Sequence, residues 1–393
     1  MADRGRELAR KALHIAMGGF AFLLSWLTWW QAALCAVVAL LNNLFLLPRI
    51  GGRKVFRGAA EREGHDPGIV LYPLSVLVLI LVFRRHLEIV AAAWAFLAFG
   101  DGIATVAGVG FGRLTGPLPW NRDKSWAGLL GFLAGGIPMA VLLFLFVAGP
   151  RDPRVTGLGL QPGGPWQVAA VLAVIGAAMA IVESLPLGIN DNLVVPLGSG
   201  ALIYAATLVD HDRLGAAMTI AGSRLPWALA VNAAIAWLAF VLKTVDVSGV
   251  VHGVALGTAV WVFGGGPAFV MLVLFFVLGT VATKVGHKTK AREGTAQEKG
   301  GRRGARHAWA NTGAAMLFCV LAATTPYTAL FQLALVAALA TATSDTLGSE
   351  IGQAFGRRTF LITTFRPVPR GTDGAVSLEG TLAGILGSVA FGL

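Results

Sequence analysis

Apolar residues occur along this chain in long runs that short polar stretches interrupt. Most runs are about 16–22 residues long, the length at which a helix crosses the hydrocarbon layer of a membrane. Because lipid offers no hydrogen-bond partners to exposed backbone groups, the runs are expected to be helical. The pattern predicts about thirteen spans, at residues 13–29, 31–47, 69–83, 89–99, 127–148, 166–182, 193–209, 226–242, 247–263, 267–283, 308–323, 330–342 and 375–393.

Composition agrees with this pattern. Hydrophobic residues make up 56% of the 393-residue chain, charged residues only 13%, and the mean hydropathy is +0.72. Soluble domains carry about 25% charged residues, so a soluble fold is excluded. The sequence therefore predicts an all-α polytopic membrane protein whose first partner is the lipid bilayer.

Basic residues gather in alternate breaks between the predicted spans. With the N-terminus in the cytoplasm, most of the 31 Lys and Arg residues fall on the cytoplasmic side, as the positive-inside rule requires. Basic loops beside anionic lipid then explain the net charge of +11 without a nucleic acid partner. We expect an integral protein of the bacterial cytoplasmic membrane, with its N-terminus and its sites facing the cytoplasm.

One frame of an acid, spaced glycines and an arginine occurs twice. The first copy consists of Asp101, Ala104, Gly108, Gly112 and Arg113, followed by Ser125 and Gly128. The second consists of Asp345, Gly348, Gly352, Gly356 and Arg357, followed by Ser377 and Gly380. A motif that recurs in register gains weight. The repeat predicts two related helical-bundle halves, at residues 1–212 and 213–393, each with its own site.

A phosphate site is the favoured interpretation of this frame. A carboxylate at the membrane boundary, glycines on one helical face and an arginine beyond them suit a metal-bound phosphate that lies against backbone and cation. The alternatives are that the glycines serve close helix packing and that each aspartate forms a solvated salt bridge. A charge at the end of an apolar run is costly and usually functional, and the duplication adds to this. Glu350 is a weaker candidate, because Val106 stands at its position in the first copy.

The loops after each frame carry further candidates. Asn121 and Lys124 lie in a short loop that opens a span, where backbone donors at a helix start would add to a phosphate site. The loop after the second copy offers Arg370, Thr372 and Asp373. For the loop with Asn121 and Lys124, the alternative is an ordinary interfacial loop.

A proline break between two predicted spans holds Glu183, Asp191 and Asn192. A broken polar segment is tolerated in a membrane protein where it lines a cavity, although a simple turn capped by Asp191 is the alternative. His14 near the first span adds support only. The basic ends of the hydrophilic loop at 284–307 could clamp an anionic ligand. Because no P-loop, protein-kinase signature or HExxH motif occurs, any phosphoryl transfer uses another scaffold.

Several separated motifs of the first half resemble the membrane polyprenol kinases, the family of dolichol kinase and phytol kinase. They are RKALHI at 10–15, FGDGIATVAGVGFGR at 99–113, NRDKSWAG at 121–128 and ESLPLGINDNLVVPL at 183–197. The second half resembles a different membrane family, the one that contains phytyl-phosphate kinase. The stretches that carry this likeness are GTVATKVGHKTK at 279–290, RRGARHAWANTGAA at 302–315 and the long block at 344–384. The chain thus resembles a fusion of two enzymes that act in succession on a prenyl alcohol.

This resemblance implies phosphorylation of a prenyl alcohol, such as phytol, geranylgeraniol or farnesol, to the monophosphate and then to the diphosphate. It implies Mg²⁺ as cofactor and CTP as the usual phosphate donor. The implied catalytic residues are Asp101, Lys124, Glu183, Asp345 and Arg357. The implied phosphate ligands are Gly108, Gly112, Arg113, Asn121, Ser125, Gly352, Gly356, Arg370 and Thr372. The implied metal ligands are Asp101, Asp191, Asp345, Glu350 and Asp373, and the implied substrate ligands are His14, Asn192 and Asn311.

Three other hypotheses stay open. A membrane cytidylyltransferase would make a CDP-activated lipid and release pyrophosphate instead of CDP. A transporter built on a parallel repeat is less favoured, because the polar residues collect at one membrane face and carriers usually bind substrate near the midplane. In the third, one half is active and the other is a structural remnant, although both copies keep the aspartate, the glycines and the arginine.

Overall fold

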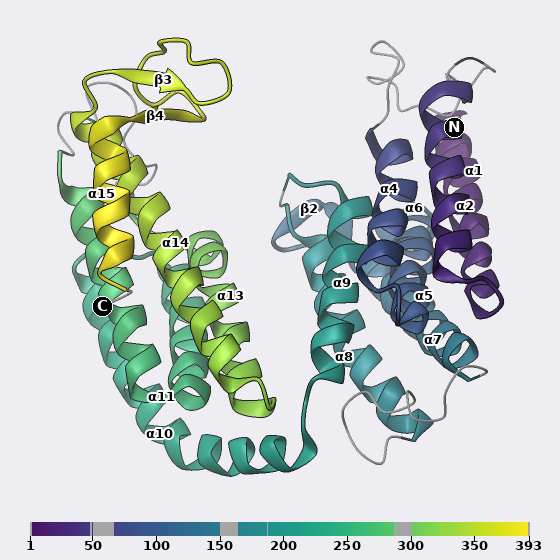
Figure 1. Cartoon of the computed structure of the whole chain (residues 1–393), viewed down its shortest axis with the longest axis horizontal. Coiled ribbons are helices and arrows are strands. Elements are labelled where there is room, and N and C mark those ends of the chain that lie inside the picture. The colour runs from purple at the N-terminus through teal and green to yellow at the C-terminus, as the bar shows by residue number, and fades with distance from the viewer. Residues whose placement is uncertain are drawn as a thin grey trace. The chain divides into compact units, whose positions relative to one another are not determined.

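The computed structural model describes residues 2–47, 49, 67–149, 164–186, 188–286, 290 and 301–391 (Figure 1). Two basic stretches separate predicted spans, at 49–62 and at 284–307, and much of both lies outside the described residues. The chain folds into two compact units, Met1–Leu208 (unit 1) and Val209–Leu393 (unit 2). Among the described residues, seven helices are long and apolar enough to cross a membrane. The all-α polytopic membrane fold is confirmed.

The described part of unit 1 consists of helices and one short strand pair. Its elements are α1 (Ala2–Gly18), η1 (Gly19–Ser25), α2 (Trp29–Leu41), η2 (Asn42–Leu46), α4 (Pro67–Val82), α5 (Leu87–Ala95), η4 (Phe96–Asp101), α6 (Gly102–Thr115), β1 (Pro117–Leu118), β2 (Asn121–Ser125), α7 (Trp126–Ala148), α8 (Pro165–Ser184) and α9 (Asp191–Thr207).

The centre of unit 1 is one helical segment from Leu87 to Thr115, made of α5, η4 and α6. Every residue of α5 is buried, and the core of the unit is built around it. The predicted span at 89–99 is shorter than this helix, because the chain stays helical past the charged residue. Asp101 is the last residue of the π-helical turn η4 and is itself buried. Such wide turns often mark functional positions, since they re-aim a side chain within a helix.

The helices described in unit 2 are fewer and mostly longer than those described in unit 1. Its elements are α10 (His211–Val241), α11 (Val247–Lys284), α13 (Ala305–Thr324), α14 (Thr328–Phe355), β3 (Thr359–Leu361), β4 (Ala375–Ser377) and α15 (Leu378–Val389). α11 contains a break at Gly265, whose φ of 74° leaves the helical range, so it corresponds to the two predicted spans at 247–263 and 267–283. The predicted span at 375–393 instead begins with strand β4, and α15 has only 12 residues.

The repeated frame folds into the same local structure in both units. In each, a glycine-bearing helix leads into an antiparallel strand pair and then into a helix, as α6–β1–β2–α7 and as α14–β3–β4–α15. Ser125 and Ser377 are the N-caps of α7 and α15, and their Oγ atoms accept hydrogen bonds from the backbone N–H of Gly128 (3.2 Å) and Gly380 (3.1 Å). The sequence pattern did not predict the strand pairs.

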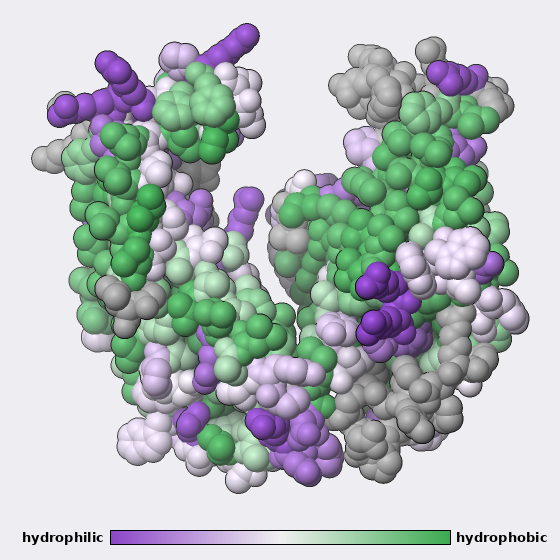
Figure 2. Space-filling model, in the orientation of Figure 1, coloured by the Kyte–Doolittle hydropathy of each residue, from purple (hydrophilic) through white to green (hydrophobic). Residues whose placement is uncertain are grey.

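Large apolar side chains lie on the outer surfaces of the helices. Trp166 is 88% exposed, Leu386 71% and Trp237 68%, and Figure 2 shows apolar residues over the helical sides of each unit. Patches of this extent are rare on soluble proteins. They are the surface that a bilayer covers, in agreement with the fold.

Gly380→Ala is expected to destabilise the protein, whereas Gly128→Ala is not. A Cβ at Gly380 would lie 2.5 Å from the Gly348 carbonyl oxygen, which is backbone and cannot yield, while a Cβ at Gly128 would lie 3.3 Å from the Ala104 oxygen. Overpacking of this kind costs about 1–3 kcal/mol, but alanine gains about 1 kcal/mol of helix propensity over glycine. The apparent Tm in detergent should fall for Gly380→Ala and stay level or rise for Gly128→Ala.

Candidate metal and phosphate sites

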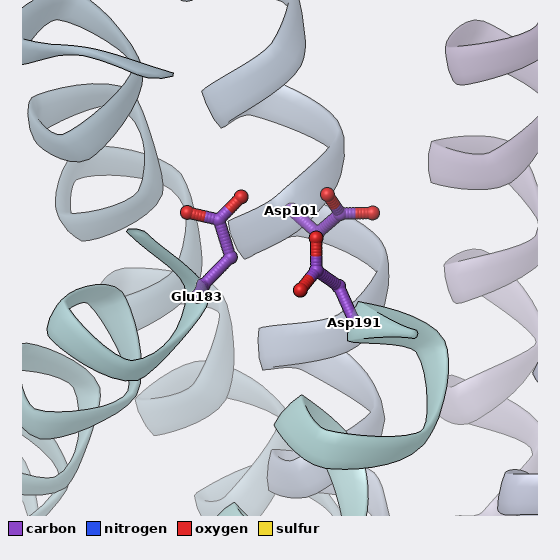
Figure 3. A group of neighbouring side chains, drawn as sticks. All are labelled: Asp101, Glu183 and Asp191. Carbon is purple, nitrogen blue, oxygen red and sulfur yellow. The ribbon is translucent and has the colours of Figure 1, made fainter. Parts of the chain in front are cut away.

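Three carboxylates from separate elements of unit 1 converge. Asp101 ends η4, Glu183 lies in the last turn of α8, and Asp191 is the first residue of α9. One ligand oxygen from each lies within 4.8 Å of the others (Figure 3). The helix is interrupted between the end of α8 at Ser184 and the start of α9 at Asp191, and this interruption places Glu183 and Asp191 close together. The π-helical turn η4 places Asp101 beside them. Clustered carboxylate oxygens are the hard donors that Mg²⁺ prefers.

Two lysines neutralise part of this acidic cluster. The Lys11 Nζ lies 2.5 Å from Asp101 Oδ2, and both side chains are buried. Lys124 Nζ donates to Glu183 Oε1 and lies 3.3 Å from Asp191 Oδ2. Burial lowers the pKa of Lys124, but the charges of Glu183 and Asp191 outweigh this effect and raise it. Lys124 therefore stays protonated near neutral pH and presents a positive charge beside the carboxylates.

Lys11 was not predicted, although it stands in the RKALHI motif. It lies on α1, three residues before His14, so both side chains leave the same helical face. His14 Nε2 lies 3.0 Å from the Leu97 carbonyl oxygen and 3.4 Å from Asp101 Oδ2. The available signal was the spacing of a cation and an imidazole on one face, at the point where the chain becomes apolar. His14 is thus a neighbour of Asp101 and borders the carboxylate from the side of α1.

A cavity of about 570 Å³ opens beside the cluster. Its lining includes the predicted residues Gly108, Gly112, Arg113, Lys124, Ser125 and Glu183. A Cβ at Gly112 would lie 3.0 Å from Ser125 Oγ, so this glycine permits the close approach of α6 to the start of α7. The glycine face of α6 thus packs closely against the start of α7 and also lines the polar cavity. The helix-packing interpretation of these glycines is therefore compatible with the phosphate-site interpretation.

Asn121 and Asn192 have local structural partners. Asn121 Nδ2 donates to the Ser184 carbonyl oxygen at 3.0 Å, which fastens strand β2 to the end of α8 and so positions Lys124 near Glu183. Asn192 Nδ2 donates to the Gly68 carbonyl oxygen at 2.8 Å, which ties α9 to α4. Their roles as phosphate and substrate ligands stay predictions.

Unit 2 has an equivalent cavity of about 680 Å³. The predicted residues that line it are Asp345, Gly352, Thr372 and Asp373, together with the frame residues Gly348, Ser377 and Gly380. Asp345 lies within α14 and is exposed, whereas Asp101 is buried. Gly356 is buried, and a Cβ there would lie 2.9 Å from Ser377 Oγ. The two frames thus share the order of their elements but differ in the burial of the aspartate.

Four predicted residues of the second site, Gly356, Arg357, Arg370 and Glu350, do not line this cavity. Arg357 is exposed and lines a separate surface hollow with Arg358, because the helix ends before it at Phe355. Arg370 lines neither hollow. Glu350 is 2% exposed and its Oε2 accepts from Lys290 Nζ at 2.5 Å, while its Oε1 accepts from Thr283 Oγ1 at 3.0 Å. Five residues along a helix turn a side chain by about 140°, so Glu350 faces away from Asp345.

In the described part of the chain, the predicted metal ligands Asp345, Glu350 and Asp373 do not cluster as the three acids of unit 1 do. The metal roles of Asp345 and Asp373 stay predictions. Within the described ranges, the acidic group close enough to share an ion is Asp101, Glu183 and Asp191. Asp345 and Asp373 still line one cavity, while Glu350 belongs to a buried ion pair.

Lys290→Ala and Glu350→Ala are each expected to lower the stability of the protein. Both side chains are 2% exposed, and removal of one partner leaves the other charge buried, which costs about 3–5 kcal/mol. The double variant Lys290→Met with Glu350→Leu should recover much of the apparent Tm, because apolar groups replace both charges. Stable single variants would show that the pair is solvated in the membrane-embedded protein.

Comparison with known proteins places these features in context. Residues 230–393 match the family described as "Integral membrane protein DUF92". "Protein VTE6, chloroplastic" from Arabidopsis thaliana is 43% identical over 145 residues, which are 36% of this chain and 44% of that protein. An uncharacterized membrane protein from Synechocystis is 41% identical over 142 residues, which are 35% of this chain and 55% of that protein. This chain spans about half the length of these two relatives.

A "Probable phytol kinase, chloroplastic" from Zea mays is 29% identical over 224 residues, which are 53% of this chain and 69% of that protein. No solved structure matches the chain. The chain is thus similar to an integral membrane family over its second part and to proteins named as probable phytol kinases.

Proposed function

We propose that this membrane protein is a prenyl kinase with two sites, one for each of two successive phosphorylations. Unit 1 would convert a prenyl alcohol such as phytol, geranylgeraniol or farnesol to its monophosphate, and unit 2 would convert the monophosphate to the diphosphate. The observation that carries the proposal is the group of Asp101, Glu183 and Asp191 beside a glycine-faced cavity. The same helix, strand pair and helix recur at Asp345 around a second cavity.

The comparisons support the substrate class. Several relatives bear the name "Probable phytol kinase", and the motifs of unit 1 resemble the polyprenol kinases. A prenyl tail remains in the bilayer while its head group reaches the membrane surface, where a water-soluble nucleotide arrives. The apolar surface and the polar cavities suit such a substrate. The basic loops favour cavities that face the cytoplasm, which we include in the proposal.

The residues of unit 1 fit Mg²⁺ as cofactor, because their donor set consists of carboxylate oxygens. Asp101, Glu183 and Asp191 would hold the ion, which would neutralise charge on the transferring phosphate. CTP is proposed as the donor on the basis of the resemblance. In this scheme the bond from the terminal phosphorus to its bridging oxygen breaks, and a bond to the prenyl hydroxyl oxygen forms. The nucleoside diphosphate and a proton are released.

The chain's own side chains would position these reactants. Lys11 and His14 hold the Asp101 carboxylate in place, where it can orient the attacking hydroxyl. Lys124 and Arg113 line the cavity and present positive charge to the phosphates. Phosphoryl transfer depends mainly on such positioning and charge neutralisation. In unit 2, Asp345, Asp373 and Thr372 would meet the phosphates in the equivalent cavity.

The proposal is tested with the purified protein in nanodiscs, Mg²⁺ and each nucleoside triphosphate in turn. Farnesol, geranylgeraniol and phytol serve as acceptors, and chromatography resolves the mono- and diphosphates. We expect both products, with CDP formed from CTP. Release of pyrophosphate with a CDP-linked lipid would instead support a cytidylyltransferase. Transport of a lipid or nucleotide without any phosphorylated product would support a carrier.

A further inference from the structure

Unit 2 contains two further cavities that the proposed reaction does not use. A mainly apolar cavity of about 130 Å³ lies among α10, α11 and α13, and its lining includes Leu256, Phe269 and Phe275. A smaller cavity of about 30 Å³ is lined by Lys243, Thr244, Thr280, Thr283, Lys284, Gly301 and Arg303. Arg303 lines both cavities. An apolar space and a cationic space therefore both border Arg303.

Arg303 is held in place by backbone and side-chain contacts. Its N–H donates to the Thr244 carbonyl oxygen at 2.9 Å, and its own carbonyl oxygen accepts from the Asp246 N–H at 3.2 Å. Its Nη2 donates to Thr283 Oγ1 at 3.4 Å. A Cβ at Gly279 would lie 2.6 Å from Arg303 Nη1, so the guanidinium rests on the bare face of that glycine. The cation is thus positioned before any ligand arrives.

The smaller cavity has the character of an anion site. Three of its lining residues, Lys243, Lys284 and Arg303, are cations, and its lining contains no acid. The nearby Glu350 already accepts from Lys290, and Asp246 caps α11. Thr280 Oγ1 is buried and has no hydrogen-bond partner among the described residues. Lys243 adopts a φ of 56°, a conformation that costs energy for a residue with a side chain and that clusters at ligand sites.

The apolar cavity has room for part of a hydrocarbon chain. Its volume is close to the roughly 150 Å³ of an apolar cavity that binds benzene, which corresponds to about one isoprene unit. Asn232, His307 and Asn311 supply polar groups on its wall. Burial and the charges of Arg303 and Arg306 lower the pKa of His307, so its imidazole is neutral near pH 7. The predicted substrate ligand Asn311 thus lines this cavity and not the cavity at Asp345.

We propose that these two adjacent cavities bind a prenyl monophosphate, with its phosphate at Arg303, Lys243 and Lys284 and the first part of its tail between α10, α11 and α13. The choice of an isoprenoid tail rests on the proposed function. The site is separate from the glycine-faced cavity at Asp345, since the two cavities share no lining residue. It gives unit 2 a binding site for the product of the first phosphorylation.

Binding of labelled farnesyl monophosphate to the full-length protein in detergent tests this site, with nucleotide and Mg²⁺ omitted. Arg303→Gln should weaken binding of this probe about tenfold or more, because it removes a charge-assisted contact, and should change farnesol binding less than about twofold. Gly279→Ala should act in the same direction, since its Cβ displaces the guanidinium. Arg303→Gln and Gly279→Ala must keep the wild-type elution volume, so that lost binding is not lost folding.

The tail contact is tested by a separate pair of variants. Gly253 lines the apolar cavity, and a Cβ there meets open space, so Gly253→Leu fills the cavity without a backbone clash. It should weaken both farnesol and farnesyl monophosphate about tenfold. Gly222→Leu is the control, because Gly222 on α10 is exposed, has open space at its Cβ and lies outside the cavity.

Two outcomes would overturn the inference. One is wild-type affinity for the probe in folded Arg303→Gln protein. The other is displacement of the probe by phosphatidic acid as readily as by unlabelled farnesyl monophosphate, which would make this a phospholipid site. Because no turnover is measured, failure of this site leaves the two-step kinase intact. Conversely, loss of probe binding in Arg303→Gln would stand even if no kinase product forms.

Discussion

Asp101→Asn is expected to abolish phosphorylation of the prenyl alcohol while sparing the conversion of added prenyl monophosphate. The amide keeps the shape of the side chain but removes the charge that meets Lys11 and that completes the group with Glu183 and Asp191. Loss of a side chain that accepts or donates a proton in the reaction lowers the rate by about 10²–10⁴-fold. The measurement follows monophosphate formed from farnesol and, separately, diphosphate formed from farnesyl monophosphate.

The separation of the two steps is the decisive part of this result. Asp101 belongs to unit 1, and the equivalent aspartate of unit 2 is untouched. A folded Asp101→Asn protein that loses both steps equally would contradict the assignment of one step to each unit. A protein that retains the first step at the wild-type rate would remove Asp101 from the site. Thermal unfolding in detergent, compared with wild type, shows whether the buried substitution has disturbed the fold.

The convergence in unit 1 was within reach of the sequence because its residues break a strong pattern. A charge at the end of an apolar run is costly in lipid, which singles out Asp101. Glu183 and Asp191 stand at a polar proline break between two spans, and Lys124 lies in a loop that opens a span. The helical fold followed from run lengths alone, since lipid leaves the backbone few alternatives.

Other features depend on contacts that no local pattern encodes. Lys11 pairs with Asp101 across 90 residues of sequence, and a basic residue near the N-terminus reads equally well as a loop charge. The π turn at η4 and the two strand pairs depend on how neighbouring helices pack. Glu350 shared a motif with Asp345, yet the rotation of the helix turned it toward Lys290. Proximity in sequence was misleading there because a helix has more than one face.

Asp345→Asn is expected to produce the reciprocal result, an accumulation of prenyl monophosphate from the alcohol with little diphosphate. Asp345 lines the second cavity with Asp373 and Thr372. It precedes the spaced glycines of α14 as Asp101 precedes those of α6 in unit 1. We expect a loss of about 10²-fold or more in the second step. The first step should proceed at the wild-type rate, so the ratio of mono- to diphosphate in a single time course measures the effect.

Asp212→Asn is the matched control, because Asp212 is an exposed aspartate of unit 2 in the first turn of α10. It lines neither the cavity at Asp345 nor the two cavities at Arg303. It should leave the product ratio unchanged. Since Asp345 is exposed, its substitution by the isosteric amide removes no buried partner, and a changed product ratio then reports chemistry and not folding. A wild-type ratio in Asp345→Asn would mean that the second frame is a structural remnant, and that both phosphates, if formed, are added at Asp101.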